Sequence, residues 1–111
     1  MSYITNLEMY SFRLIFLWLP NEELAIARVA ERVRMGGHDV PEKTIRRRYH
    51  AGLRNFFHLY HPLADTWYFY DNSGIGEPRL LAYGEQKQSL LVNNPLVWHN
   101  IEKTYENKKG N

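Results

Sequence analysis

The chain has 111 residues, of which 44% are hydrophobic and 23% are charged, and it contains no cysteine. This length and composition allow one small globular domain with a single core. The lack of cysteine excludes disulfide scaffolds, thiolate zinc sites and cysteine catalysis, and indicates a reducing, cytoplasmic setting. The net charge of +2 is too small by itself to indicate a nucleic-acid partner. The longest apolar run, Leu14–Leu19, is far shorter than the ~20 residues of a membrane-spanning helix, so we expect no membrane partner.

The N-terminal third is expected to contain one strand and one helix. Residues 1–11 have no clear period and are compatible with the end of a helix. The run Arg13–Leu19 ends at Pro20 and is typical of an internal strand in a parallel sheet, buried on both faces. Asn21 is a good N-cap for a helix that should stop at glycines 36 and 37. The apolar stripe expected on this helix comprises Leu24, Ala27 and Ala30, with Ile26, Val29 and Val33.

A second, longer helix is predicted from about Pro41 to about Tyr60. Asp39 and Glu42 have the spacing of a capping box, and proline is tolerated in a first helical turn. Apolar residues recur every three or four positions along one face, namely Ile45, Tyr49, Leu53, Phe56, Phe57 and Tyr60. The opposite face carries Lys43, Arg47, His50, Arg54 and His58. The helix is therefore amphipathic, and its polar face is basic.

The C-terminal half is expected to form a hairpin and a short helix. The aromatic run Thr66–Asp71 predicts a buried strand, residues 72–78 a turn, and Arg79–Gly84 an antiparallel strand at the sheet edge. Residues 85–89 are expected to be a loop, followed by a brief pairing of residues 90–92. A short last helix should begin at Asn94 and Pro95, end near Tyr105 and leave residues 106–111 as a solvated tail.

These elements predict an α/β fold. Its sheet would have about three strands (one internal, one aromatic and one antiparallel hairpin strand), together with two long helices and a short C-terminal helix. His58 and His61 are three residues apart, but no third residue with suitable spacing accompanies them, so we expect no metal site.

Positive charge is concentrated between Arg28 and Arg54, where eight Lys+Arg and three Asp+Glu give a balance of +5, which leaves −3 for the rest of the chain. Arginine binds phosphate through two parallel hydrogen bonds and is charged at any working pH. This region could therefore contact nucleotide phosphates or a nucleic-acid backbone. The alternative is a solvated basic face balanced by acidic neighbours.

Five short motifs occur in a fixed order. They are IFLWLPN at 15–21, ARVAERV at 27–33, GGHDVPE at 36–42, IRRRY at 45–49 and YDNSG at 70–74. Together, over about residues 12–84 and more loosely to Ile101, they resemble the C-terminal half of the zeta-toxin-like P-loop kinases, often described as predicted ABC-type ATPases.

The resemblance implies a partial, doubly wound P-loop-kinase sheet within one truncated domain at residues 1–105. Residues of about 34–48 would form the lid that closes on ATP, and Mg²⁺ would be the second cofactor. Relatives would phosphorylate a small acceptor, which is a UDP-amino sugar in the zeta-toxin case. Arginines of the lid and its flanking helices contact phosphates in this family, and the matching candidates are Arg28, Arg32, Arg46, Arg47 and Arg48, with His38 in the lid. Arg28 and Arg32 are favoured because they lie on the helix that leads into the lid. An ion pair with Glu31 or Glu42 is the alternative for any one of these arginines.

The sequence also departs from the family. Members carry the P-loop lysine, the Mg²⁺-binding Ser/Thr and the catalytic carboxylate upstream of the strand that contains Trp18. Here only about eleven residues precede that strand, and the pattern G-x-x-x-x-G-K-S/T does not occur. We therefore expect no catalytic residue and no kinase activity from this chain alone.

A sheet without its neighbouring strands would leave the strand of Phe16 and Trp18 with an unpaired edge. This predicts a homo-oligomer formed across that edge, or pairing with a separate N-terminal half. A non-enzymatic self-association or partner-docking module is thus the alternative function. Nucleic-acid binding through the face of Lys43, Arg47 and Arg54 is less favoured, because the aromatic residues lie on the buried face.

Overall fold

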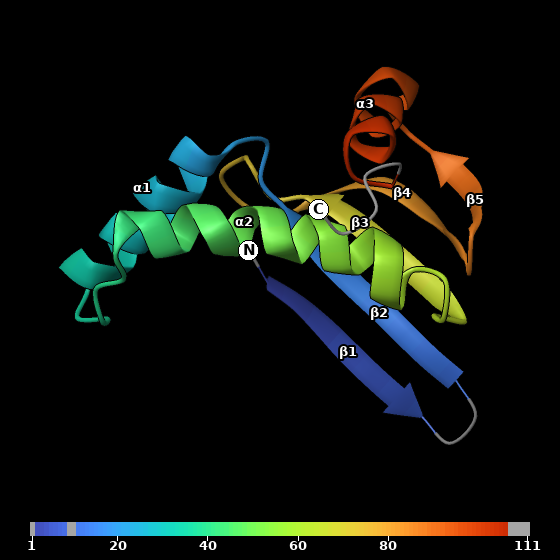
Figure 1. Ribbon diagram of the computed structural model, residues 1–111, viewed down its shortest axis with the longest axis horizontal. Coiled ribbons are helices and arrows are strands. Elements are labelled where there is room, and N and C mark those ends of the chain that lie inside the picture. Colours follow the sequence, from blue (N-terminus) through green and yellow to red (C-terminus); the bar gives the residue numbers. More distant parts are fainter. Residues whose placement is uncertain (1, 9–10, 107–111) are drawn as a thin grey trace.

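The computed structural model describes residues 2–8 and 11–106, which form an α/β fold around a mixed five-stranded sheet (Figure 1). The strand order is β1-β2-β3-β4-β5. β2 and β3 run parallel, and all other neighbours run antiparallel. In chain order the elements are β1 (Ser2–Glu8), β2 (Ser11–Trp18), α1 (Glu22–Arg34), α2 (Glu42–Asn55), the π-helical turn η1 (Phe56–Tyr60), β3 (Thr66–Asp71), β4 (Arg79–Glu85), β5 (Gln88–Val92) and α3 (Pro95–Tyr105).

The N-terminal segment is a strand, so the expected end of a helix was wrong. β1 pairs antiparallel with β2 along its whole length, with Tyr3 opposite Phe16. Pairing with a neighbouring strand can override a weak local pattern, because it satisfies the backbone groups of both strands. β1 occupies the edge of β2 that we expected to be unpaired, so association across that edge is not available. Residues 1, 9 and 10, which belong to the expected helix, and 107–111, which belong to the expected tail, lie outside the described residues.

The sheet has five strands rather than about three, because β1 and β5 add to the three that were predicted. β5 includes Gln88 and Ser89, which were expected to be loop. Gln86 adopts a φ of 50°, and the chain reverses through Gln86 and Lys87 between the paired residues Glu85 and Gln88. This is the geometry of a tight hairpin, whose usual Asn-Gly or Asp-Gly signal is absent from the sequence. β4 is therefore an internal strand and not the edge.

The three predicted helices are present, and local signals explain the ends of α1. The second helix was expected to reach about Tyr60, but α2 ends at Asn55 and residues 56–60 continue as the π-helical turn η1. The side chain of Asn21 accepts a hydrogen bond from the Leu24 N–H at 2.8 Å and so caps α1. At the other end Gly36 has a φ of +101°, and the Gly37 N–H donates to the Arg32 carbonyl at 2.8 Å. This is the arrangement by which glycine commonly terminates a helix. The capping box at Asp39 is wrong, since the N-cap of α2 is Pro41 and no side chain caps this helix.

The helices cover one face of the sheet. Phe16 of β2 and Phe69 of β3 stack with ring centroids 4.9 Å apart, and Phe56 lies 5.2 Å from both. From α3, Trp98 reaches the same Phe69 at 4.9 Å. The layer of α2, η1 and α3 therefore packs on this face, while α1 lies beside α2 (Figure 1). Among the described residues no helix covers the opposite face, so the doubly wound arrangement, with helices on both faces, is not formed.

Two predictions of burial were also wrong in detail. On α1 the buried residue is Ala25, while Ala27 and Ala30 of the expected apolar stripe are exposed. On β2 the side chains that point away from the helices, Ile15 and Leu17, remain partly exposed. The predicted apolar face of α2 is confirmed for its five residues up to Phe57, whereas Tyr60 is only partly buried. No helix in the described part of the chain combines the length and apolarity needed to cross a bilayer.

Candidate functional site

A hollow of about 160 Å³ lies between α1 and α2, next to the segment that connects the two helices. It is lined by apolar residues, one tyrosine and two arginines: Ala25, Val29, Arg32, Val40, Ile45, Arg48 and Tyr49. Val40 comes from the segment that connects the helices, which the tight turn at Gly36 directs back toward α2. Residues from both helices and from their connection therefore meet around one space.

Arg32 and Arg48 are the two expected phosphate ligands that the fold brings together at this hollow. Each projects from a different helix, and both side chains are exposed. Neither arginine forms an ion pair with any of the described residues. Two cations with free donors beside an apolar recess are suited to bind an anion, because guanidinium groups form strong, charge-assisted hydrogen bonds to phosphate oxygens.

Arg28, which was favoured together with Arg32, has a different environment. Its Nη2 donates to the Asn72 carbonyl at 2.8 Å, so the side chain joins α1 to the segment after β3. Arg47 is exposed on α2 and does not line the hollow, and His38 is exposed in the connection between the helices. The fold thus separates the six candidates instead of collecting them around one ligand.

Arg46 is held by three carboxylates. Its Nη1 donates to Glu22 and to Glu23 at 3.0 Å each, and its Nη2 donates to Glu42 at 2.7 Å. These contacts raise the pKa of the Arg46 guanidinium, with the hydrogen bond to Glu42 as the largest cause. The alternative of an ion pair with Glu42 is therefore what the structure contains for this arginine.

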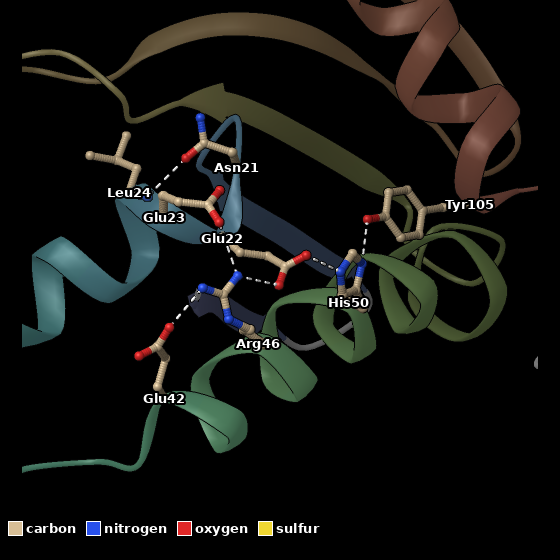
Figure 2. A network of polar contacts seen from close by, with 8 residues as sticks. All are labelled: Asn21, Glu22, Glu23, Leu24, Glu42, Arg46, His50 and Tyr105. Carbon is tan, nitrogen blue, oxygen red and sulfur yellow. Dashed lines mark hydrogen bonds and ion pairs between the residues drawn. The ribbon is translucent and has the colours of Figure 1, made fainter.

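Glu22 extends the same network to α3, as Figure 2 shows. His50 Nε2 lies 2.6 Å from Glu22 Oε2, and His50 Nδ1 lies 2.8 Å from the Tyr105 hydroxyl. The carboxylate can only accept, so Nε2 carries the proton and, in the neutral ring, Nδ1 accepts from the Tyr105 O–H. The hydrogen bonds from His50 and then from Arg46 hold the pKa of the Glu22 carboxyl below its ordinary value. Burial raises the pKa of Tyr105, which keeps its hydroxyl protonated.

This network fixes the geometry of the hollow. It joins α1 through Glu22, α2 through Arg46 and His50, and α3 through Tyr105. Tyr49 makes a further link, since its buried hydroxyl donates to the Leu19 carbonyl at 2.7 Å. The two walls that carry Arg32 and Arg48 are therefore held in one arrangement before any ligand binds.

Sequence reasoning missed the roles of Glu22, His50 and Tyr105. The helical pattern places Glu22 in a first turn, where the helix dipole favours an acid, and His50 on a basic face, and neither position indicates that the two residues meet. Tyr105 was named as the end of the last helix. Their contacts join positions 28 and 55 residues apart in the chain, and no local pattern encodes such pairings.

The other hollows and polar groups of the structure are weaker candidates for a functional site. A larger hollow of about 410 Å³ has His99, Glu102, Lys103 and Glu106 in its lining, all at or just beyond α3, so among the described residues it brings no distant parts of the chain together. His58 Nε2 donates to the Tyr105 carbonyl at 2.7 Å, and His61 is buried among aromatic rings. Within residues 2–8 and 11–106, no group of three His, Asp or Glu side chains could hold a metal ion.

Three comparisons with known proteins were made for the whole chain. No protein-family model, no curated protein and no solved structure matches it. The function therefore has to be argued from the arrangement of its own residues.

Proposed function

We propose that the hollow between α1 and α2 binds the phosphate groups of a nucleotide, as the lid of an ATP-dependent, zeta-toxin-like kinase would do. The observation that carries this proposal is the placement of Arg32 and Arg48 on opposite helices of one recess. The five motifs described above make a nucleoside triphosphate the first ligand to test.

The electrostatics of the region support this choice. The carboxylates of Glu22, Glu23 and Glu42 are engaged with Arg46, and Glu31 is paired with Arg34 at 2.5 Å. These four acids of α1 and α2 thus already have partners other than Arg32 and Arg48. Since the apolar wall of Val29 and Ile45 excludes some water, an anion held there would interact with the arginines more strongly than in bulk solvent.

The proposal concerns binding and not phosphoryl transfer. Arginines can neutralise phosphate charge, but the transfer step also needs groups that position the γ-phosphate and the metal. The pattern G-x-x-x-x-G-K-S/T does not occur in these 111 residues, and no described cluster fits Mg²⁺. In our proposal Mg²⁺ would arrive with the nucleotide, and a separate segment that carries a P-loop would complete the kinase. A cytoplasmic location, suggested by the lack of cysteine, belongs to the same proposal.

Calorimetric titration tests the binding site. The full chain is titrated with Mg·ATP and, separately, with inorganic tripolyphosphate, which contains the phosphates without the nucleoside. Loss of one charge-assisted contact is expected to weaken binding by roughly 10- to 100-fold, so Arg32→Ala and Arg48→Ala should each do so.

Arg47→Ala is the matched control, because it removes the same charge from the position next to Arg48 without touching the hollow. Equal losses in Arg47→Ala and Arg48→Ala would show only general attraction of an anion to a basic surface. Absence of heat with both ligands for the unaltered protein would also refute the proposal.

A further inference from the structure

The sheet face opposite the helices carries a continuous apolar row. Ile15 pairs with Tyr68, Tyr68 with Tyr83, and Tyr83 with Leu91, so these residues form one line across β2 to β5. Directly paired residues point to the same side of a sheet. The Tyr68 and Tyr83 rings stack at 5.4 Å with an interplanar angle of 10°. A second row, formed by the pairs of Leu17 with Tyr70 and of Tyr70 with Leu80, lies beside the first.

Both rows remain open to solvent. All of their side chains are partly or fully exposed, and Leu91 has 44% of its surface exposed. A sheet with one solvated face normally alternates apolar and polar residues, whereas β2 and β3 place large apolar or aromatic side chains on both faces. Contiguous exposed apolar patches are typical of interaction sites.

Two residues of opposite charge, Arg13 and Glu85, lie at the rim of this face. Arg13 of β2 pairs with Thr66 of β3. The next residue of β3, Trp67, pairs with Gly84 of the antiparallel strand β4, so Glu85, which follows Gly84, lies beside Thr66. Arg13 on β2 and Glu85 on β4 therefore belong to the same row, on either side of β3. They are two strand spacings apart, which is about 10 Å. Both are exposed, and neither forms an ion pair with the residues that the structure describes.

This pattern is self-complementary. A twofold axis parallel to β3 and midway between two stacked sheets places β2 of one copy over β4 of the other. Arg13 of each copy then lies over Glu85 of the other, while Tyr68 and Tyr70 lie at the axis. Stacked sheets are about 10 Å apart, a gap that an arginine and a glutamate reaching from opposite sides can close.

We infer that this open sheet face binds a second copy of the chain, in an isologous, face-to-face dimer joined by two Arg13–Glu85 ion pairs. Five strands about 4.8 Å apart and about six residues long give a face of roughly 24 × 20 Å. Two such faces bury on the order of 1,000 Å², the lower limit of specific protein interfaces. The inference does not depend on phosphate binding, because the hollow between α1 and α2 is on the other side of the sheet.

Charge exchange tests the inference by sedimentation equilibrium of the full chain over a range of concentrations. Wild type should form a dimer. Arg13→Glu alone places four acids in the interface and Glu85→Arg alone places four bases there, so each variant should dimerise roughly tenfold or more weakly. In an equimolar mixture of the two variants every introduced acid faces a base, and the dimer should return.

Recovery in the mixture is specific to two copies related by this twofold axis. Arg47→Glu, which makes the same charge change on α2, is the control and should leave the dimer intact. A wild-type protein that stays monomeric at millimolar concentration would overturn the inference. The open sheet face would then be a site for a different partner. A wild-type dimer whose two charge variants do not recover on mixing would overturn it as well, since another surface would then form the dimer.

Discussion

The hydroxyl of Tyr105 lies 2.8 Å from His50 Nδ1, and this contact joins the last helix of the chain to the two helices around the candidate phosphate site. His50 in turn contacts Glu22, whose carboxylate also holds Arg46. The arrangement of the hollow therefore depends on residues that do not line it.

Tyr105→Phe removes the hydroxyl from this network and keeps the ring. We expect a loss of about 1 kcal/mol in the free energy of unfolding, because one partly buried hydrogen bond is lost and His50 Nδ1 loses its partner. Urea denaturation measures the change. In a His50→Ala background the same substitution should cost close to nothing, and an equal cost in both backgrounds would contradict the contact.

His61 should make the stability of the protein depend on pH. The side chain is 2% exposed and lies against Trp67, and burial lowers its pKa to about 4 from an ordinary value of 6.5. Between these values the unfolded chain binds a proton that the folded protein does not. Stability should therefore be highest above pH 6.5 and fall as the pH decreases toward 4, by a few kcal/mol in total.

His61→Leu removes this proton uptake while keeping an apolar side chain in the core. Denaturation curves at pH 7, 5.5 and 4.5 should show a smaller loss of stability for the variant than for wild type. The carboxylates of Glu22 and Glu23, whose pKa values are lowered, lose their contribution only below about pH 4.5 and affect both proteins alike. Parallel pH profiles would rule out the buried neutral state of His61.

Trp98 should be among the most costly side chains to truncate. Its ring lies 5.6 Å or less from Phe57, Trp67 and Phe69, and it is 3% exposed. Trp98→Ala should cost about 3–5 kcal/mol, because it leaves a cavity where α3 meets the sheet. Trp98→Phe should cost clearly less, about 1–2 kcal/mol, since Trp98 Nε1 has no hydrogen-bond partner in the described residues. Equal costs in urea denaturation would contradict this.

Gly84 is expected to tolerate no side chain. A Cβ atom there would lie 2.1 Å from the Gln88 carbonyl oxygen and 2.7 Å from the Trp67 ring. Gly84→Ala should therefore cost more than about 3 kcal/mol or prevent folding. Gly74→Ala is the matched control, because a Cβ atom at that turn meets nothing within 4 Å, and it should change stability by less than about 0.5 kcal/mol. Circular dichroism during thermal unfolding compares the two.

Prediction from the sequence succeeded where the structure depends on contacts between residues that are close in the chain, and it failed where distant segments meet. The start of α1 at Asn21 and its end at Gly36 depend on contacts within a few residues, and both were predicted correctly. β1 and β5 were missed or shortened because their main support is hydrogen bonding to a neighbouring strand, which their own residues indicate weakly.

The same distinction between local and distant contacts applies to the candidate site. The positions of the arginines on two basic helices follow from the helical period, so the sequence could nominate all of them. Which arginines stay free depends on where acids from other elements lie. Glu22 and Glu23 reach Arg46 from α1, and the Asn72 carbonyl reaches Arg28 from the segment after β3.

The sequence by itself determined the single core, the presence of three helices, the ends of α1, and the concentration of positive charge between Arg28 and Arg54. These properties arise from composition and from contacts close in the chain. The tertiary structure decided that the helices cover one face of the sheet, that Arg32 and Arg48 share a recess, and that a row of aromatic and aliphatic side chains remains open. These features depend on which distant segments meet, and packing of the whole chain fixes that choice.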